Sequence, residues 1–194
     1  MKMSQKSNKR LESTKEYIDM LGKKNSKLNI VRVDLGYKKP HSQTTTLKEA
    51  NNDLKHMLNN TRSKPSIFGH QEGYILKREY TEDKGMHIHA MVIFDGQKVQ
   101  KSAFKADQIG KYWEKTTKGK GCYHNCHRNT YERNGIGILE HDNRDKHKIL
   151  YDDIIPYLCK EEQDLESLKG NKKNRAFTRG TLPKKEGKKG RPRS

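Results

Sequence analysis

Residues 73–96 read GYILKREYTEDKGMHIHAMVIFDG, and this stretch decides the fold. Its two halves, 73–80 and 87–94, are rich in aromatic and branched side chains, and residues 82–85 (EDKG) between them are typical of a turn. The pattern predicts a β-hairpin. Because the second half ends in the apolar run 90–94, that strand is expected to lie in the core of a sheet.

Hydrophobic spacing on both sides of the hairpin predicts the remaining elements. They are strands at 28–35 and 135–139 and helices at 46–60, 101–115 and 149–168. The resulting order is strand, helix, strand, strand, helix, strand, helix. It predicts an α+β fold of the ferredoxin or RRM type, with a central antiparallel β-sheet and helices packed on one side. Trp113 is expected in the core, and Pro156 is tolerated only in the first turn of the last helix.

The two ends of the chain differ from this central part in composition. Residues 1–26 are polar and Lys-rich, and they are expected to form a basic extension, either a short helix on the domain or a loose segment. Residues 27–169 are expected to form the functional domain. Residues 170–194 carry many Lys and Arg residues against one acid, Glu186, which is typical of a disordered basic tail.

The charge predicts the class of partner. Only 30% of the residues are hydrophobic, 34% are charged, and the formal net charge is +18. Such an excess indicates a polyanionic partner, nucleic acid first and an anionic membrane surface second. The polar start of the chain predicts no signal peptide. The strongest apolar run of the whole sequence, 90–94, is too short to span a bilayer. An odd number of cysteines, Cys122, Cys126 and Cys159, favours reduced thiols in a cytoplasm.

The hairpin carries a candidate metal site. Side chains alternate between the faces of a strand, so His87 and His89 point the same way, about 7 Å apart along the backbone. Glu79 has the matching parity on the preceding strand and can lie beside them. Two imidazoles and a carboxylate suit Mg²⁺ or Mn²⁺ and leave positions open for a substrate oxygen. The alternative is a pair of structural histidines, which a His-x-His pattern alone indicates more often.

The last predicted helix carries a candidate nucleophile. Tyr157 and Lys160 are three residues apart and therefore share a helix face. A tyrosine hydroxyl has a pKa near 10, and a nearby metal or ammonium favours the phenolate that attacks a phosphodiester. Tyr151 is the rival nucleophile. The bland alternative is that Tyr157 is a half-buried aromatic and Lys160 its solvated neighbour.

Residues 116–134 are rich in Gly and Lys and are expected to form a mobile basic loop. Lys118, Lys120 and Arg128 would contact DNA there, and Tyr123 or Tyr131 could stack on a base. The same segment holds a compact group of soft ligands, Cys122, His124, Cys126 and His127. These spacings are tighter than those of a usual zinc finger, so zinc is the minor alternative.

Taken together, these residues resemble the HUH endonuclease superfamily in its replication-initiator branch. Residues 78–96 look like its second motif, including the acidic ligand before the histidines, and residues 157–160 (YLCK) look like its third, the nucleophilic tyrosine with its lysine. Residues 28–35 lie where the first motif belongs but depart from its common form, so no site role is carried over to them.

The wider pattern is similar to the YagK/YfjJ and filamentous-phage-type replication proteins. The matching text is RVDL at 32–35, IGKYW at 109–113, GIG at 135–137 and YLCK at 157–160. The resemblance implies site-specific nicking and joining of single-stranded DNA or an origin hairpin through a 5′-phosphotyrosine, using Tyr157 alone. It further implies a bacterial cytoplasm and a host helicase that supplies unwinding.

Two other functions stay open on the sequence. The first is a non-catalytic, RRM-like nucleic-acid-binding protein, in which His87 and His89 are structural; the absence of standard stacking motifs on the central strands counts against it. The second is an HUH transposase or recombinase, which uses the same chemistry and which the sequence barely separates from an initiator.

Overall fold

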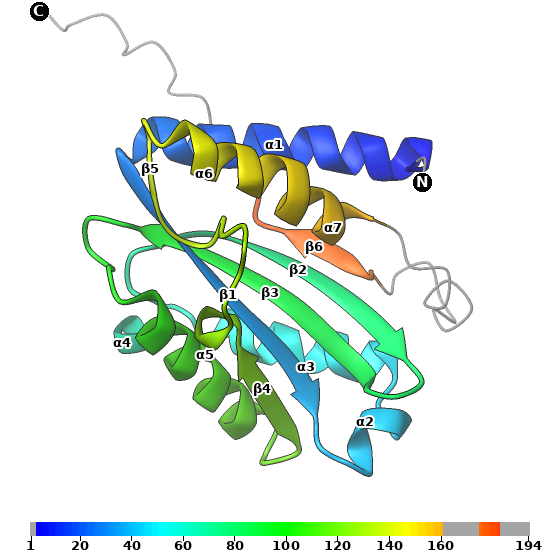
Figure 1. Ribbon diagram of the computed structural model, residues 1–194. Coiled ribbons are helices and arrows are strands. Elements are labelled where there is room, and N and C mark those ends of the chain that lie inside the picture. Colours follow the sequence, from blue (N-terminus) through cyan, green and yellow to red (C-terminus); the bar gives the residue numbers. More distant parts are fainter. Residues whose placement is uncertain (1–2, 161–174, 183–194) are drawn as a thin grey trace, which may run out of the picture.

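The computed structural model describes residues 3–160 and 175–182, and all statements below concern these residues (Figure 1). Their centre is a six-stranded antiparallel sheet in the order β4-β1-β3-β2-β6, in which β5 also pairs with β1. The strands are β1 (Lys27–Tyr37), β2 (Gln71–Thr81), β3 (Gly85–Asp95), β4 (Gly121–Asn125), β5 (Gly137–Glu140) and β6 (Phe177–Arg179). The predicted α+β fold with a central antiparallel sheet is confirmed.

The predicted hairpin is confirmed as β2 and β3. Glu79 pairs with His87 and Lys77 pairs with His89 across the two strands. The apolar run of β3 is buried on both faces of the sheet, because helices cover both. This central strand fixes the register of its neighbours, since a slip by one residue would turn every buried side chain to the wrong face.

One face of the sheet is covered by α3 (Leu47–Asn59), α4 (Pro65–Phe68) and α5 (Ser102–Thr116), which lie below it in Figure 1. Helix α3 begins with a capping box in which Thr46 and Glu49 bond each other's backbone N–H groups. Trp113 is fully buried, as predicted, and its indole N–H donates to the carbonyl of Gly36 at 2.9 Å. These helices cover the face of the sheet opposite to the candidate metal site.

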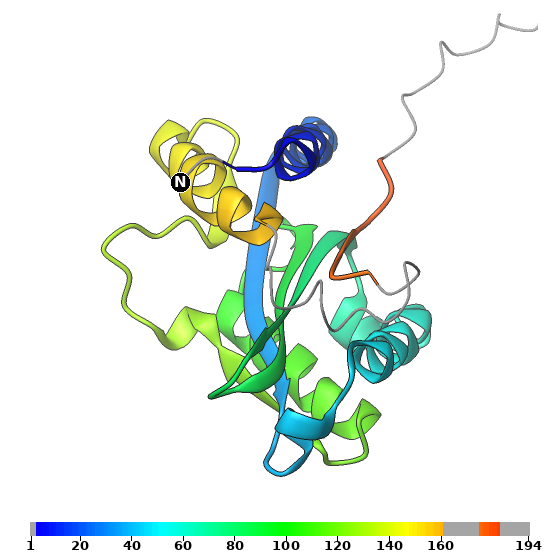
Figure 2. The same cartoon turned by 90° about the vertical axis from the view of Figure 1, so that its right-hand side faces the viewer.

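The opposite face carries helices that the sequence did not predict there. Helix α1 (Gln5–Lys24) lies alongside the helical run of α6 (Arg144–Ile149), a π-helical segment (Leu150–Ile154) and α7 (Ile155–Cys159), as Figure 2 shows from the side. Tyr17, Ile18 and Leu21 of α1 are buried in a second core cluster between these helices and the sheet. The N-terminal segment is therefore a long helix that contributes to the core, so the helices are not confined to the α3–α5 side.

Three further segments differ from expectation. The predicted mobile loop 116–134 contains β4, which pairs with β1, and a 3₁₀ turn, Cys126–Arg128. The predicted basic tail includes β6, which pairs with β2; the rest of that tail, except 175–182, lies outside the described residues, as does the predicted end of the last helix at 161–168. Pro156 occupies the first turn of α7, but α7 continues the helical run that begins at Arg144, so the prediction that Pro156 lies at the start of the last helix is wrong. Among the described helices, none is long and apolar enough to cross a membrane.

Replacing Gly85 should destabilise the hairpin that carries the candidate site. Gly85 has φ +70°, and a Cβ there would lie 2.1 Å from the backbone oxygen of Ser42. Gly85→Ala should therefore lower the free energy of unfolding by more than the roughly 1–3 kcal/mol of left-handed strain alone. Gly119→Ala is the matched control for denaturant titration, because Gly119 has φ +81° with open space around it. Equal losses in the two variants would contradict the steric account.

Candidate functional site

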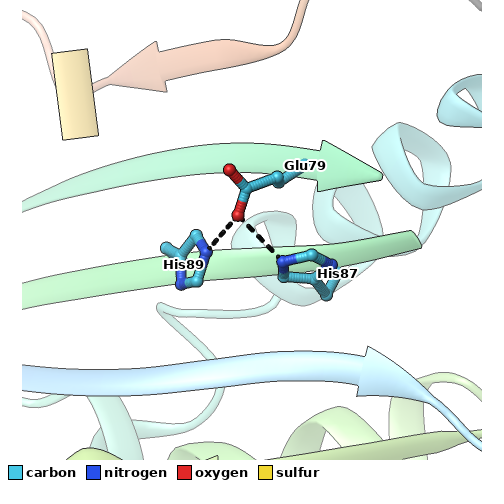
Figure 3. A group of neighbouring side chains, drawn as sticks. All are labelled: Glu79, His87 and His89. Atoms are coloured by element: carbon cyan, nitrogen blue, oxygen red, sulfur yellow. Dashed lines mark hydrogen bonds and ion pairs between the residues drawn. The ribbon is translucent and has the colours of Figure 1, made fainter. Parts of the chain in front are cut away.

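The candidate metal ligands Glu79, His87 and His89 point toward one another from β2 and β3, as Figure 3 shows. They lie on the sheet face that carries α1 and α7. One carboxylate oxygen of Glu79, Oε2, lies 2.9 Å from Nε2 of His87 and 2.8 Å from Nε2 of His89. The three ligand atoms all lie within 4.8 Å of one another. We call this group the Glu79–His87–His89 triad. It is the sole such His/Cys/Asp/Glu group found within the part of the chain that the structure describes.

The outer hydrogen bonds of the two histidines orient them as ligands. Nδ1 of His87 donates to the carbonyl of Gly85 at 3.0 Å, and Nδ1 of His89 donates to Oδ1 of Asp34 at 2.8 Å. In the neutral rings each Nε2 then presents a lone pair toward the carboxylate of Glu79. Three such atoms within 4.8 Å of one another could all bind one cation. The donor set therefore fits a divalent metal, whose bonds to such atoms are about 2.0–2.2 Å long.

The charges around the triad are coupled. Burial disfavours the charged form of His89, but its hydrogen bonds with Asp34 and Glu79 outweigh burial and raise the pKa of His89. Burial likewise opposes the ionisation of Asp34, yet the hydrogen bond from His89 and the charge of Arg32 hold the pKa of Asp34 below its usual value. The site therefore favours an ionised Asp34 and a positive charge on or beside His89.

Tyr157 reaches the triad from α7. Its hydroxyl donates to Nε2 of His89 at 2.8 Å and lies 3.4 Å from Oε2 of Glu79. The phenol ring packs edge-on against His89 with ring centroids 5.2 Å apart, and 42% of Tyr157 is exposed to solvent. The predicted nucleophile and the predicted metal ligands therefore lie in direct contact, on one side of the sheet, with the phenol open to solvent.

The lysine beside Tyr157 is not the one that the sequence indicated. Lys160 is exposed and lies just after α7 ends, with extended backbone angles (φ −63°, ψ 137°), so the argument from a shared helix face does not hold for it. Lys77 of β2 is 2% exposed instead, and its Nζ lies 4.5 Å from the centre of the Tyr157 ring and 3.5 Å from Oε1 of Glu79. The sole sequence signal for Lys77 was its strand parity, which it shares with Glu79.

Strand β1 also contributes to this face. Asp34 pairs with His89 across the strands, and Arg32, two residues earlier, lies 3.4 Å from Oδ1 of Asp34. The sequence of this strand alone indicates no site role, because residues 28–35 depart from the common form of the motif. The spacing Arg-x-Asp on a strand of known parity was the signal that could have found both residues.

Of the four predicted DNA-binding residues, two are exposed lysines and two contact other residues of the protein. Lys118 and Lys120 are exposed in the turn between α5 and β4, where both are open to a partner. Arg128 is exposed but forms an ion pair with Asp107 at 2.8 Å. Tyr123 points to the other side of the sheet, since its ring packs against Gly110 of α5, and so it does not present a free face to a base.

The group proposed as a minor zinc alternative is not assembled. Cys122, His124, Cys126 and His127 do not bring three ligand atoms together in the described structure. His124 is hydrogen-bonded to Asn129, and Nε2 of His127 accepts the backbone N–H of Arg32 at 3.1 Å. These contacts favour structural roles for both rings.

Tyr151, the rival nucleophile, lies elsewhere. Its hydroxyl donates to Asp19 of α1, in a surface cavity of about 290 Å³ that Ile18, Leu139 and His147 also line. Burial and the hydrogen bond to Asp19 raise the pKa of Tyr151. Both effects disfavour the phenolate, and no residue of the triad lines that cavity. Of the two candidate nucleophiles, Tyr157 therefore contacts the Glu79–His87–His89 triad and Tyr151 lies in a separate cavity.

Comparison with known proteins gives a single family. The family model of the YagK/YfjJ C-terminal domain matches residues 2–180. No curated protein and no solved structure matches the chain. The matched range begins at α1 and includes β6, so it covers all the elements described above. The chain therefore belongs to the YagK/YfjJ C-terminal domain family.

Proposed function

We propose that this protein is a metal-dependent nicking and joining enzyme for single-stranded DNA, of the HUH type, that initiates rolling-circle replication of a phage, prophage or plasmid. The observation that carries the proposal is the 2.8 Å contact between the hydroxyl of Tyr157 and Nε2 of His89. A nucleophile within reach of a cation-binding triad is the arrangement that phosphodiester transfer to tyrosine requires. Family membership and the net charge of +18 agree with it.

Glu79, His87 and His89 would hold a divalent metal, which we propose to be Mg²⁺ or Mn²⁺. Bound there, the metal would polarise the scissile phosphate and stabilise the leaving oxygen. Asp34 and the carbonyl of Gly85 fix the two imidazoles from behind, so little rearrangement of the ligands is needed on binding.

Tyr157 supplies the nucleophile. Its oxygen forms a bond to phosphorus while the bond between phosphorus and the 3′ oxygen breaks, which leaves a 5′-phosphotyrosine and a free 3′-hydroxyl. The phenol proton leaves to solvent, to which Tyr157 is open, and the 3′ oxygen takes up a proton from solvent, because Glu79 and His89 would be occupied as metal ligands. The ammonium group of Lys77 beside the ring favours the phenolate. The covalent bond preserves the energy of the cleaved linkage for later joining.

The test must not assume a recognition sequence. The protein is incubated with a pool of single-stranded oligonucleotides that contain a randomised segment, with Mn²⁺ or with EDTA. Complexes that survive denaturation in SDS are then recovered and their DNA is sequenced. The proposal expects adducts only with the metal, enriched for one cleavage site. A protein that binds the pool but forms no adduct with Mn²⁺ or Mg²⁺ would be a non-catalytic nucleic-acid-binding protein.

A further inference from the structure

Arg32 is a buried cation that the proposed chemistry has not used. Only 8% of the residue is exposed, and it lies on β1 on the same face as the Glu79–His87–His89 triad. Among residues 3–160 and 175–182 it forms a single ion pair, which is a long one, 3.4 Å from Nη2 to Oδ1 of Asp34. That same oxygen already accepts the shorter hydrogen bond from His89 at 2.8 Å. The carboxylate of Asp34 is therefore shared between Arg32 and His89.

The guanidinium group has unused donors. Its Nε is buried without any hydrogen-bond partner, although a guanidinium carries five N–H donors in a planar fork. Leaving a buried charge incompletely paired is costly, so an oxygen that approached the guanidinium group would recover part of that cost. A planar fork with free donors matches the oxygens of a phosphate.

Within the part of the chain that the structure describes, no second carboxylate forms an ion pair with Arg32. His127 accepts the backbone N–H of Arg32, and burial together with the charges of Arg32 and Lys146 lowers the pKa of His127 to about 4. That ring is therefore neutral near pH 7. Asp34, two residues after Arg32, accepts a hydrogen bond from Nδ1 of His89, and the hydroxyl of Tyr157 contacts Nε2 of the same ring. Arg32 is thus linked to Tyr157 through two side chains, those of Asp34 and His89, on the same face of the sheet.

We propose that Arg32 binds a backbone phosphate of the single-stranded DNA, next to the phosphate attacked by Tyr157. This inference rests on the proposed single-stranded DNA substrate. Arg32 would hold the strand in register with the triad through charge-assisted hydrogen bonds, and a phosphate there would complete the donors that Asp34 leaves unused. It would contribute to affinity and position rather than to the choice of sequence.

The salt dependence of DNA binding tests the proposal. Binding of a fluorescent single-stranded oligonucleotide is measured with Mn²⁺ over a range of salt concentrations, in a Tyr157→Phe background that prevents covalent trapping. Arg32→Gln should weaken binding about tenfold. It should also reduce the slope of log K against log salt by about 0.7, the value for one phosphate contact on a single strand. Arg32→Met, which fills the same space without charge, gives the same readout if the Gln variant does not fold.

Two controls separate this role from others. Lys55→Gln removes the same charge from α3 on the opposite side of the sheet and should leave the slope unchanged. Asp34→Asn disturbs the hydrogen bond to His89 but keeps Arg32, so it should not reproduce the reduced slope; a reduced slope in this variant would mean that Arg32 acts only by holding Asp34. An unchanged slope in the Arg32 variants overturns the proposal. Because binding needs no cleavage, a reduced slope in the Arg32 variants, together with no adduct from the wild-type protein in the oligonucleotide-pool experiment, would refute the nickase and leave this assignment standing.

Discussion

Tyr157→Phe is expected to abolish the covalent protein–DNA adduct while DNA binding and metal binding remain. The change removes one oxygen, the atom that lies 2.8 Å from Nε2 of His89. Loss of a nucleophile costs orders of magnitude in rate, so adduct formation should fall by at least about a thousandfold. Tyr157 is partly exposed, and its ring stays in place as phenylalanine, so stability should change by less than about 1 kcal/mol. Denaturing gels with labelled DNA measure the adduct.

Tyr151→Phe is the matched control, because it removes the same atom from the same helical run. Its hydroxyl bonds Asp19 and belongs to a different cavity, so adduct formation should be retained. An adduct that persists in the Tyr157 variant and disappears in the Tyr151 variant would transfer the nucleophile to Tyr151. An adduct lost in both variants would point to damage of the helix rather than to loss of a nucleophile.

Glu79→Gln and His89→Ala are expected to remove the metal site. Each takes away one of three ligand atoms that lie within 4.8 Å of one another. Loss of an outer hydrogen-bonding partner already costs roughly 10–100-fold in metal affinity, and loss of a ligand itself should cost more. Titration calorimetry with Mn²⁺ should therefore show binding to the wild type and none, at micromolar protein, to either variant. Adduct formation should fall with it.

His124→Ala provides the control for histidine loss. His124 is exposed on β4 and contacts Asn129 rather than the triad, so its removal should leave the Mn²⁺ affinity unchanged. Wild-type protein that binds no Mn²⁺ and no Mg²⁺ would contradict the metal assignment. In that case, the histidines would be structural, and the basic surface would support only a non-catalytic nucleic-acid-binding function.

The hairpin and its triad could be predicted because strand geometry is regular. Side chains alternate with a period of two, so the parity of Glu79, His87 and His89 fixed their common face, and the turn fixed which residues are opposite. The buried run of β3 was equally plain, because apolar residues on both faces indicate a strand that is covered on both sides. Trp113 followed from the same hydrophobic spacing.

The last helix could not be predicted in detail, because its geometry is irregular. Leu150–Ile154 form a π-helical segment, which inserts a residue and shifts the phase of everything after it. Helical spacing alone therefore does not say which way Tyr157 points. The helix also ends at Cys159, so Lys160 leaves the face that it would share with Tyr157. Lys77 was concealed for a different reason: a lysine at an alternating strand position ordinarily faces solvent.

The short edge strands β4 and β6 were missed because tertiary pairing stabilises them. Residues 121–125 (GCYHN) have weak β-propensity, and their pairing with β1 overrides it. Helix α1 was underestimated because its apolar residues, such as Tyr17, Ile18 and Leu21, are few among many lysines. Their burial depends on α7 and the sheet, which local sequence does not reveal.

The most direct test of the account is to locate the covalent bond. Wild-type adduct formed with Mn²⁺ is digested with nuclease and protease, and the nucleotide-bearing peptide is identified by mass spectrometry. The account predicts one modified residue, Tyr157, carrying a nucleotide through its 5′ phosphate, and no modification in EDTA. A 5′-nucleotide on Tyr151 or on any other side chain, or an equal yield without metal, would contradict the claim that Tyr157 and the Glu79–His87–His89 triad act on one phosphate.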